Sequence, residues 1–174
     1  MEPQVNATPF ATPRSIGIKW GLISALISIV FFLILAVSGI NAFDNNWNWV
    51  HFGVSIALVV LAHKNFKESG NGYMSYGQGV GISFWIALLS VILTFLISYL
   101  YVAFIDTGMM EMFYEKQMEE MSKKGMPDDQ IDMTINWTRM LFWPIYLFFG
   151  LFSGVLVGVI VSIFTQKKNP EPAF

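Results

Sequence analysis

Four long segments without charged side chains constrain this chain more than any other feature of its sequence. No Asp, Glu, Lys or Arg occurs between Lys19 and Asp44, and similar stretches follow later in the chain. About 20 apolar residues in a helix cross the roughly 30 Å hydrocarbon core of a bilayer. The sequence therefore predicts an all-α polytopic membrane protein with four transmembrane helices, at about residues 16–40, 47–62, 78–104 and 141–164.

Three details of these segments affect the prediction. The strongly apolar part of the second segment, Val50 to Ala62, is short, so that Trp47 and Trp49 are needed to reach the interface. The first segment could be a cleaved signal peptide, but its apolar core exceeds the usual 7 to 15 residues, which favours an uncleaved helix. Pro144 lies near the start of the fourth segment, where proline disturbs a helix least.

The overall composition supports a membrane protein and removes several functional classes. Of the 174 residues, 55% are hydrophobic and 13% are charged, against about 25% charged in average proteins. Cysteine is absent, which excludes disulfides and thiolate metal sites, and a net charge of -2 gives no indication of nucleic-acid binding. Because no catalytic, phosphate-binding or dinucleotide motif occurs, we expect no catalytic residues, no cofactor and no metal site.

The distribution of basic residues predicts the orientation in the membrane. The two termini and the loop between the second and third segments hold six of the ten basic residues but only three of the twelve acidic ones. Because Lys and Arg in short flanking segments are retained in the cytoplasm, both termini are expected there. The predicted organisation is a cytoplasmic N-terminus (1–14), a single membrane domain (15–166) and a cytoplasmic tail (167–174).

The segment 106–139, between the third and fourth spans, is predicted to form an extracytoplasmic helical hairpin. An amphipathic helix is expected from Met109 to Lys124, and Gly125 and Pro127 then separate it from a second helix. We expect its apolar face to be an outer interaction surface. The residues of this face are Met110, Phe113, Tyr114, Met118 and Met121.

The many methionines of this hairpin allow two interpretations. Thioethers can bind copper in an oxidising compartment, but methionine is also a flexible filler of irregular apolar contacts. These methionines do not repeat at a tight ligand spacing, so packing is the favoured interpretation.

Small residues recur at intervals of four in three of the predicted spans. Such rows allow another helix backbone to approach closely. The candidates for helix packing are Gly150, Gly154, Gly158 and Ser162 in the fourth span, Ser90, Thr94 and Ser98 in the third, and Gly17 and Gly21 in the first. They could contact a second copy or a membrane-protein partner, but packing within one subunit is the favoured interpretation.

Several motifs of the chain resemble one small membrane family of bacteria, common in Bacteroidetes and catalogued as domain of unknown function 4199. The motifs are the turn HKNFKESGNGYMSYGQGVGISF, the long third span ending in Tyr99 and Tyr101, the outer segment FYEKQMEEMSKKGMPDDQI, and a glycine-rich last span followed by lysines. The resemblance covers nearly all of the chain after Arg14. It implies a four-span inner-membrane protein and carries no activity or functional residues.

These observations favour a non-enzymatic packing or interaction subunit of a membrane assembly, in contact with the lipid bilayer. The main reason is that no charged side chain lies inside a predicted membrane core. The alternative is a small transporter or lipid-handling protein whose polar path uses His51 and hydroxyl side chains of the third span. Those hydroxyls belong to Ser83, Ser90, Thr94 and Ser98.

Overall fold

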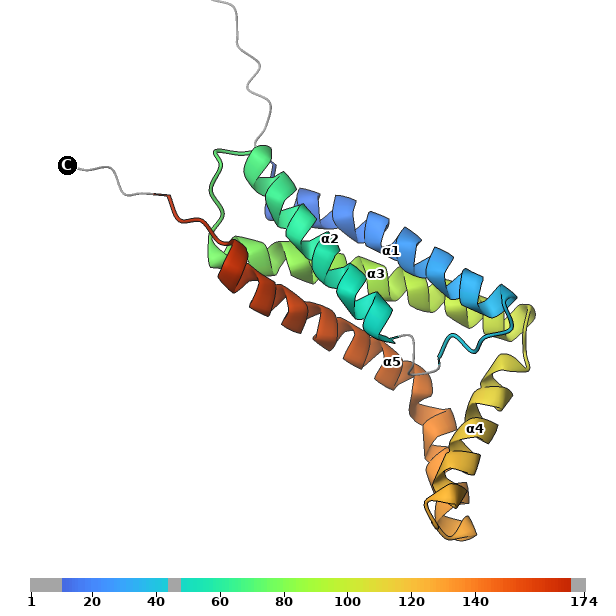
Figure 1. The fold of residues 1–174 in the computed structure, drawn as a ribbon. Coiled ribbons are helices and arrows are strands. Elements are labelled where there is room, and N and C mark those ends of the chain that lie inside the picture. Colours follow the sequence, from blue (N-terminus) through green and yellow to red (C-terminus); the bar gives the residue numbers. More distant parts are fainter. Residues whose placement is uncertain (1–10, 44–47, 170–174) are drawn as a thin grey trace, which may run out of the picture.

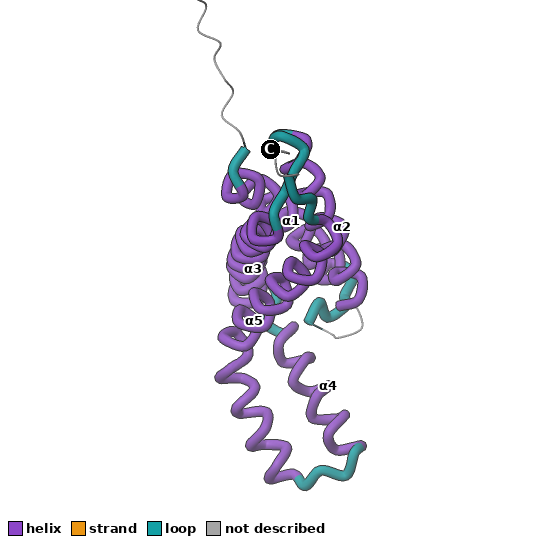
Figure 2. Tube along the Cα trace, turned by 90° about the vertical axis from the view of Figure 1, so that its left-hand side faces the viewer, coloured by secondary structure: helices purple, strands orange, loops and turns teal. Residues whose placement is uncertain are grey.

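Five α-helices make up the chain in the computed structural model, which describes residues 11–43 and 48–169. Four are long: α1 (Pro13–Val37), α2 (Asn48–Glu68), α3 (Tyr76–Phe104) and α5 (Asp128–Thr165). The fifth, α4 (Met109–Lys123), is short and lies beside the first part of α5, where the two form a hairpin that extends beyond the bundle (Figures 1 and 2). The fold is thus all-α over the described residues, as predicted.

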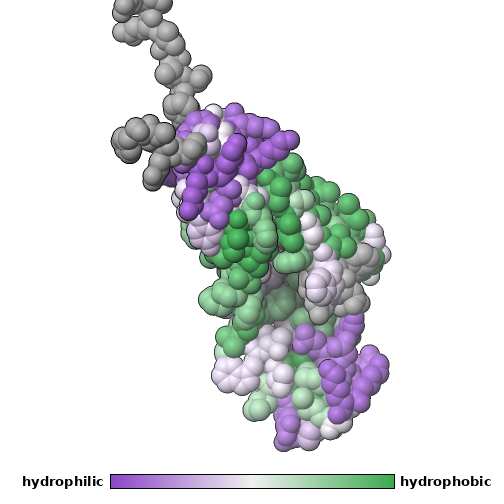
Figure 3. Space-filling model, turned by 60° about the vertical axis from the view of Figure 1, so that its left-hand side comes forward, coloured by the Kyte–Doolittle hydropathy of each residue, from purple (hydrophilic) through white to green (hydrophobic). Residues whose placement is uncertain are grey.

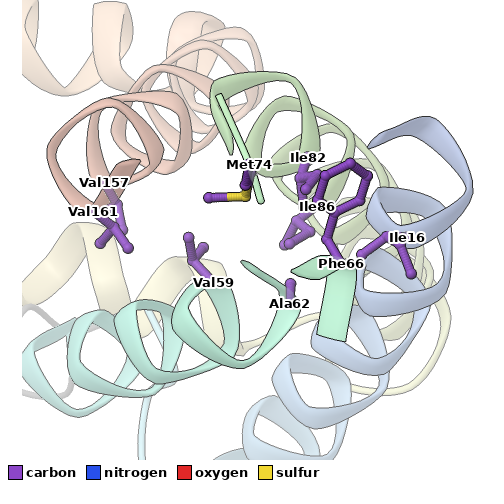
Figure 4. Packing of buried hydrophobic residues seen from close by; sticks show 9 residues of the cluster. All are labelled: Ile16, Val59, Ala62, Phe66, Met74, Ile82, Ile86, Val157 and Val161. Atoms are coloured by element: carbon purple, nitrogen blue, oxygen red, sulfur yellow. The ribbon is translucent and has the colours of Figure 1, made fainter. Parts of the chain in front are cut away.

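Helix α3 is the central element of the bundle. It packs extensively against α1 and against α5, while α2 makes smaller contacts with all three other long helices. A core cluster of apolar side chains joins the four helices near the end of the bundle where α1 begins and α5 ends (Figure 4). Its buried members are Ile16, Val59, Ala62, Phe66, Met74, Ile82, Ile86, Val157 and Val161.

Local sequence signals explain where the helices begin and end. Thr12 and Ser15 form a capping box at the start of α1, and Ser75 and Gln78 form another at the start of α3. Helix α4 is followed by Gly125 at φ 77°, a left-handed conformation that glycine adopts without steric cost. The chain then reverses direction and α5 begins.

The surface of the bundle is apolar between two hydrophilic ends. Four helices are long and apolar enough to cross a membrane: α1, α2 from Trp49, α3 and α5. Large side chains such as Leu26, Ile34 and Phe148 are more than half exposed, and Figure 3 shows hydrophobic side chains between two hydrophilic regions. An exposed apolar band of this kind is expected for a protein whose solvent is lipid.

Some helix limits differ from the prediction. Helix α2 continues beyond Ala62 to Glu68, because the polar segment that follows still forms helical pairs such as Lys64–Glu68. Helix α5 begins at Asp128, so Pro144 lies inside it rather than near its start. The predictions that concern Asp44, Trp47 and the outermost parts of both termini lie outside the described residues.

Glycines allow close contact between backbones on both sides of α3. A Cβ atom at Gly17 of α1 would lie 2.6 Å from the Cβ of Trp85, and one at Gly154 of α5 would lie 2.6 Å from the Cβ of Ala87. Gly158 faces Ser83 at even closer range. Both distances are shorter than carbon atoms tolerate, so no larger residue fits at these positions without separating the helices.

We therefore expect Gly154→Ala and Gly158→Ala to lower stability, each by about 1–3 kcal/mol, the usual cost of overpacking a filled core. Thermal unfolding in detergent measures the loss. Gly53→Ala on α2 is the matched control, because nothing lies within 4 Å of the added methyl group. Should the α5 variants keep their stability and instead change the oligomeric state, these glycines would belong to an interface between subunits.

Candidate functional site

The small residues predicted to pack between helices lie mainly along α3 and its two neighbours. Gly150 faces Val91, and Gly21 faces Leu89. The Ser90 hydroxyl accepts a hydrogen bond of 3.1 Å from the Ser24 hydroxyl of α1, while the Ser98 hydroxyl donates to the Phe95 carbonyl within α3. The structure thus brings these predicted residues into contacts within one chain.

A buried polar cluster around His63, hereafter the His63 cluster, was not identified from the sequence. It joins three helices: the His63 side chain of α2 lies among Gly79 and Ser83 of α3 and Thr165 of α5. The Nε2 atom is 3.0 Å from the Gly79 carbonyl oxygen and 3.2 Å from the Ser83 Oγ, and the Nδ1 atom is 2.7 Å from the Thr165 Oγ1. The His63 side chain is fully buried among these three helices.

The partners of His63 determine its tautomer. A carbonyl oxygen can only accept, so Nε2 carries the hydrogen and donates to Gly79. In the neutral ring Nδ1 is then an acceptor, and the Thr165 hydroxyl has two acceptors within reach, this nitrogen at 2.7 Å and the Val161 carbonyl oxygen at 2.9 Å. Lys67, one turn along α2, donates to the Thr165 carbonyl at 3.0 Å. Both the side chain and the backbone of Thr165 are therefore bound to α2.

Two further polar features lie elsewhere in the bundle. His51, near the start of α2, is 2.9 Å from the Ser28 hydroxyl of α1. Among the described residues, the buried hydroxyls of Thr94 and Ser162 have no hydrogen-bond partner. The hydroxyl residues that would form a transport path thus differ in their environment, since Ser83 and Ser90 are bound across helices whereas Thr94 is not.

The predicted outer interaction face lies inside the hairpin. Met110 and Tyr114 are buried against Ile131 and Ile135 of α5, and they form a second core cluster. Phe113, Met118 and Met121 are partly buried against the same cluster. These side chains are therefore covered by the chain itself, because α5 extends past the bundle and supplies the opposite apolar surface.

A charged pair fixes the two halves of the hairpin. Arg139 of α5 donates from both terminal nitrogens to the Glu111 carboxylate of α4, at 2.7 and 2.6 Å. The same guanidinium lies 4.5 Å from the centroid of the Tyr114 ring. The hydrogen bonds from Arg139 lower the pKa of Glu111, whereas burial raises the pKa of Tyr114.

One surface of the hairpin stays open. Met133, Asn136, Trp137 and Met140 of α5 line a hollow of about 460 Å³. The three apolar side chains are each more than half exposed. They occupy the part of α5 just before the predicted span.

No metal centre is found in the described part of the chain: nowhere do three or more His, Asp or Glu side chains gather where they could hold an ion. The hairpin methionines Met110, Met118, Met121 and Met126 lie in or against the apolar cluster around Tyr114. Their arrangement accords with the packing interpretation of the methionine-rich segment.

The fold and the apolar surface define a helical membrane protein with four segments able to span the bilayer. Residues 19–167 match the family described as protein of unknown function, DUF4199. The chain therefore belongs to this family, as its motifs indicated. No curated protein and no solved structure matches it.

The His63 cluster predicts that its members stabilise the bundle jointly. We expect His63→Leu to lower stability by about 1–3 kcal/mol, because buried partners on α3 and α5 lose a hydrogen bond. A double-mutant cycle with Thr165→Val, followed by thermal unfolding, should give a coupling of about 0.6–1.7 kcal/mol. His51→Leu combined with Thr165→Val is the control and should be additive, since His51 bonds to Ser28 of α1 and not to Thr165. Additive effects at positions 63 and 165 would contradict the role of the pair.

The Arg139–Glu111 pair predicts that the hairpin weakens in acid. The folded-state pKa of Glu111 lies below its ordinary value of 4.5, so its contribution is present above pH 4.5 and is lost as pH falls through the lowered value. Hydrogen exchange of the α4 amides should therefore lose protection below pH 4.5. Glu111→Gln should remove most of this pH dependence, whereas Glu115→Gln should retain it; equal profiles for the two variants would contradict the prediction.

Proposed function

We propose that this protein is a non-enzymatic interaction subunit of a membrane assembly, with the hairpin of α4 and α5 as its docking element. One observation carries the proposal: the hairpin is internally braced and yet leaves the open apolar surface of Met133, Trp137 and Met140. A pre-organised surface loses little conformational freedom on binding. Its partner would be a second membrane protein, since the hollow lies directly before the span that begins near residue 141.

The internal organisation of the hairpin supports a role in binding. The core of Met110, Tyr114, Ile131 and Ile135 and the bidentate Arg139–Glu111 pair hold α4 against α5. Trp137 presents a large amphipathic side chain, the type most often found at binding hot spots. Asn136, in the same hollow, supplies an amide that can donate and accept hydrogen bonds.

The alternative, a small transporter or lipid-handling protein, is favoured by a different observation. The hydroxyl of Thr94 in α3 is buried without a hydrogen-bond partner among the described residues, and hydroxyls at positions 83, 90 and 98 lie on the same helix. An unpaired hydroxyl in an apolar interior is costly and calls for an explanation. This observation concerns the bundle rather than the hairpin, so the two proposals can be tested apart.

Cross-linking in native membranes tests the docking proposal. With a photoreactive residue at Met133, we expect stoichiometric capture of one membrane protein, and Trp137→Ala should reduce the yield at least tenfold, because loss of a hot-spot anchor costs about 2 kcal/mol or more. A photoreactive residue at the exposed Glu115 of α4 is the control. Contacts only between copies of this chain would contradict the proposal and favour the transporter.

A further inference from the structure

A second hollow lies at the opposite end of the molecule from the hairpin. It has a volume of about 460 Å³ and opens between the loop that joins α2 to α3, the first turn of α3 and the residues after α5. We call it the loop–tail pocket. Its wall is fixed by a two-residue β-bridge, in which the Met74 amide donates to the Lys167 carbonyl at 2.9 Å and the Lys167 amide donates back at 2.8 Å.

The charged side chains of the loop–tail pocket are all basic among the residues that the structure describes. Lys167 and Lys168 line it, together with the polar side chains of Asn71, Ser75 and Gln78. The Lys167 ammonium lies 5.3 Å from the centroid of the Tyr73 ring, which holds it at the pocket. This lining suits an anion that can also accept several hydrogen bonds.

The pocket also has an apolar side. Ala11, Phe66 and Met74 belong to its lining, and Phe66 and Met74 are members of the core cluster that joins the four helices. Phe66 and Met74 are buried behind the surface of the pocket, whereas Ala11 is partly exposed. A single ligand could therefore place a negative group at the lysines and an apolar group beside Ala11. Free phosphate would use only the basic and polar side chains of the lining.

The position of the pocket along the bundle matches the headgroup layer of a bilayer. It lies at the end of the bundle where Arg14, Lys19, Lys64 and Lys67 are also found, and Figure 3 shows a hydrophilic region beside the apolar band at this end. Basic pockets between transmembrane helices at such a level bind anionic lipid headgroups. We propose that the loop–tail pocket binds the phosphate of an anionic phospholipid, with the glycerol and first acyl carbons against its apolar side.

Lipid titration of the purified full-length protein tests this proposal. In a detergent with an uncharged headgroup, phosphatidylglycerol should raise the thermal unfolding temperature at lower concentration than phosphatidylcholine does. Native mass spectrometry should show retained phosphatidylglycerol. Since a lysine near an anionic lipid surface contributes about 1 kcal/mol, Lys167→Gln with Lys168→Gln should weaken the apparent affinity about 30-fold. The bridge to Met74 uses only the backbone of residue 167 and survives the change.

The adjacent pair Lys123 and Lys124, at the far end of the molecule, supplies the matched control. Replacing both with Gln should leave the affinity for phosphatidylglycerol unchanged. Equal loss in the two double variants, or equal affinity of the unmodified protein for the two lipids, would overturn the proposal. Inorganic phosphate distinguishes the source of the anion: full protection by millimolar phosphate alone would identify a soluble anion site instead of a lipid site. Lipid binding at this pocket does not rest on the docking role proposed for the hairpin.

Discussion

Close approach of backbones along both sides of α3 is the contact on which the bundle depends. Apolar side chains gain little by moving from lipid into a protein interior, so transmembrane helices associate through packing and interhelical hydrogen bonds. Gly17 and Gly21 bring α1 onto α3, and Gly154 and Gly158 bring α5 onto its other side. The three most apolar helices thereby form one closely packed layer.

Helix α2 combines apolar contacts with interhelical hydrogen bonds. Its Gly53 has no neighbour within 4 Å; its Val59, Ala62 and Phe66 join the core cluster, and polar side chains add further links. His63 binds α3 and α5, His51 binds Ser28 of α1, and Lys67 binds the end of α5. Interhelical hydrogen bonds in membranes are individually weak, so α2 depends on several of them together. Of the four predicted spans, this helix also has the shortest strongly apolar run, so hydrogen bonds add to a smaller apolar contact.

The sequence determined the class of fold because apolar length and the absence of charge are local properties. Four spans and an all-helical architecture follow from them directly. The packing partner of Gly154 could not be predicted in the same way, because a row of small residues defines a groove but not the helix that fills it. His63 was missed for a related reason: its partner Thr165 is 102 residues away, and a histidine at the end of a span looks the same whether it faces headgroups or another helix.

The packing of the hairpin is another feature that the sequence pattern alone could not predict. The apolar face of α4 predicted that something covers Met110 and Tyr114, but periodicity does not say what. The cover is α5 itself, which continues through Pro144 as one helix because a proline removes a single backbone hydrogen bond and leaves the rest of the helix in place. The acidic residues at positions 128 and 129 stabilise the start of this long helix through its dipole.

The polar contacts at the other end link the loop–tail pocket to the His63 cluster. Met74 lines the pocket and carries the β-bridge to Lys167, while Thr165, two residues before that bridge, bonds to both His63 and Lys67. The walls of the pocket are therefore fixed by α2, α3 and α5 at once. The proposed lipid would therefore contact the same short stretch of chain, residues 165–168, that also bonds to α2.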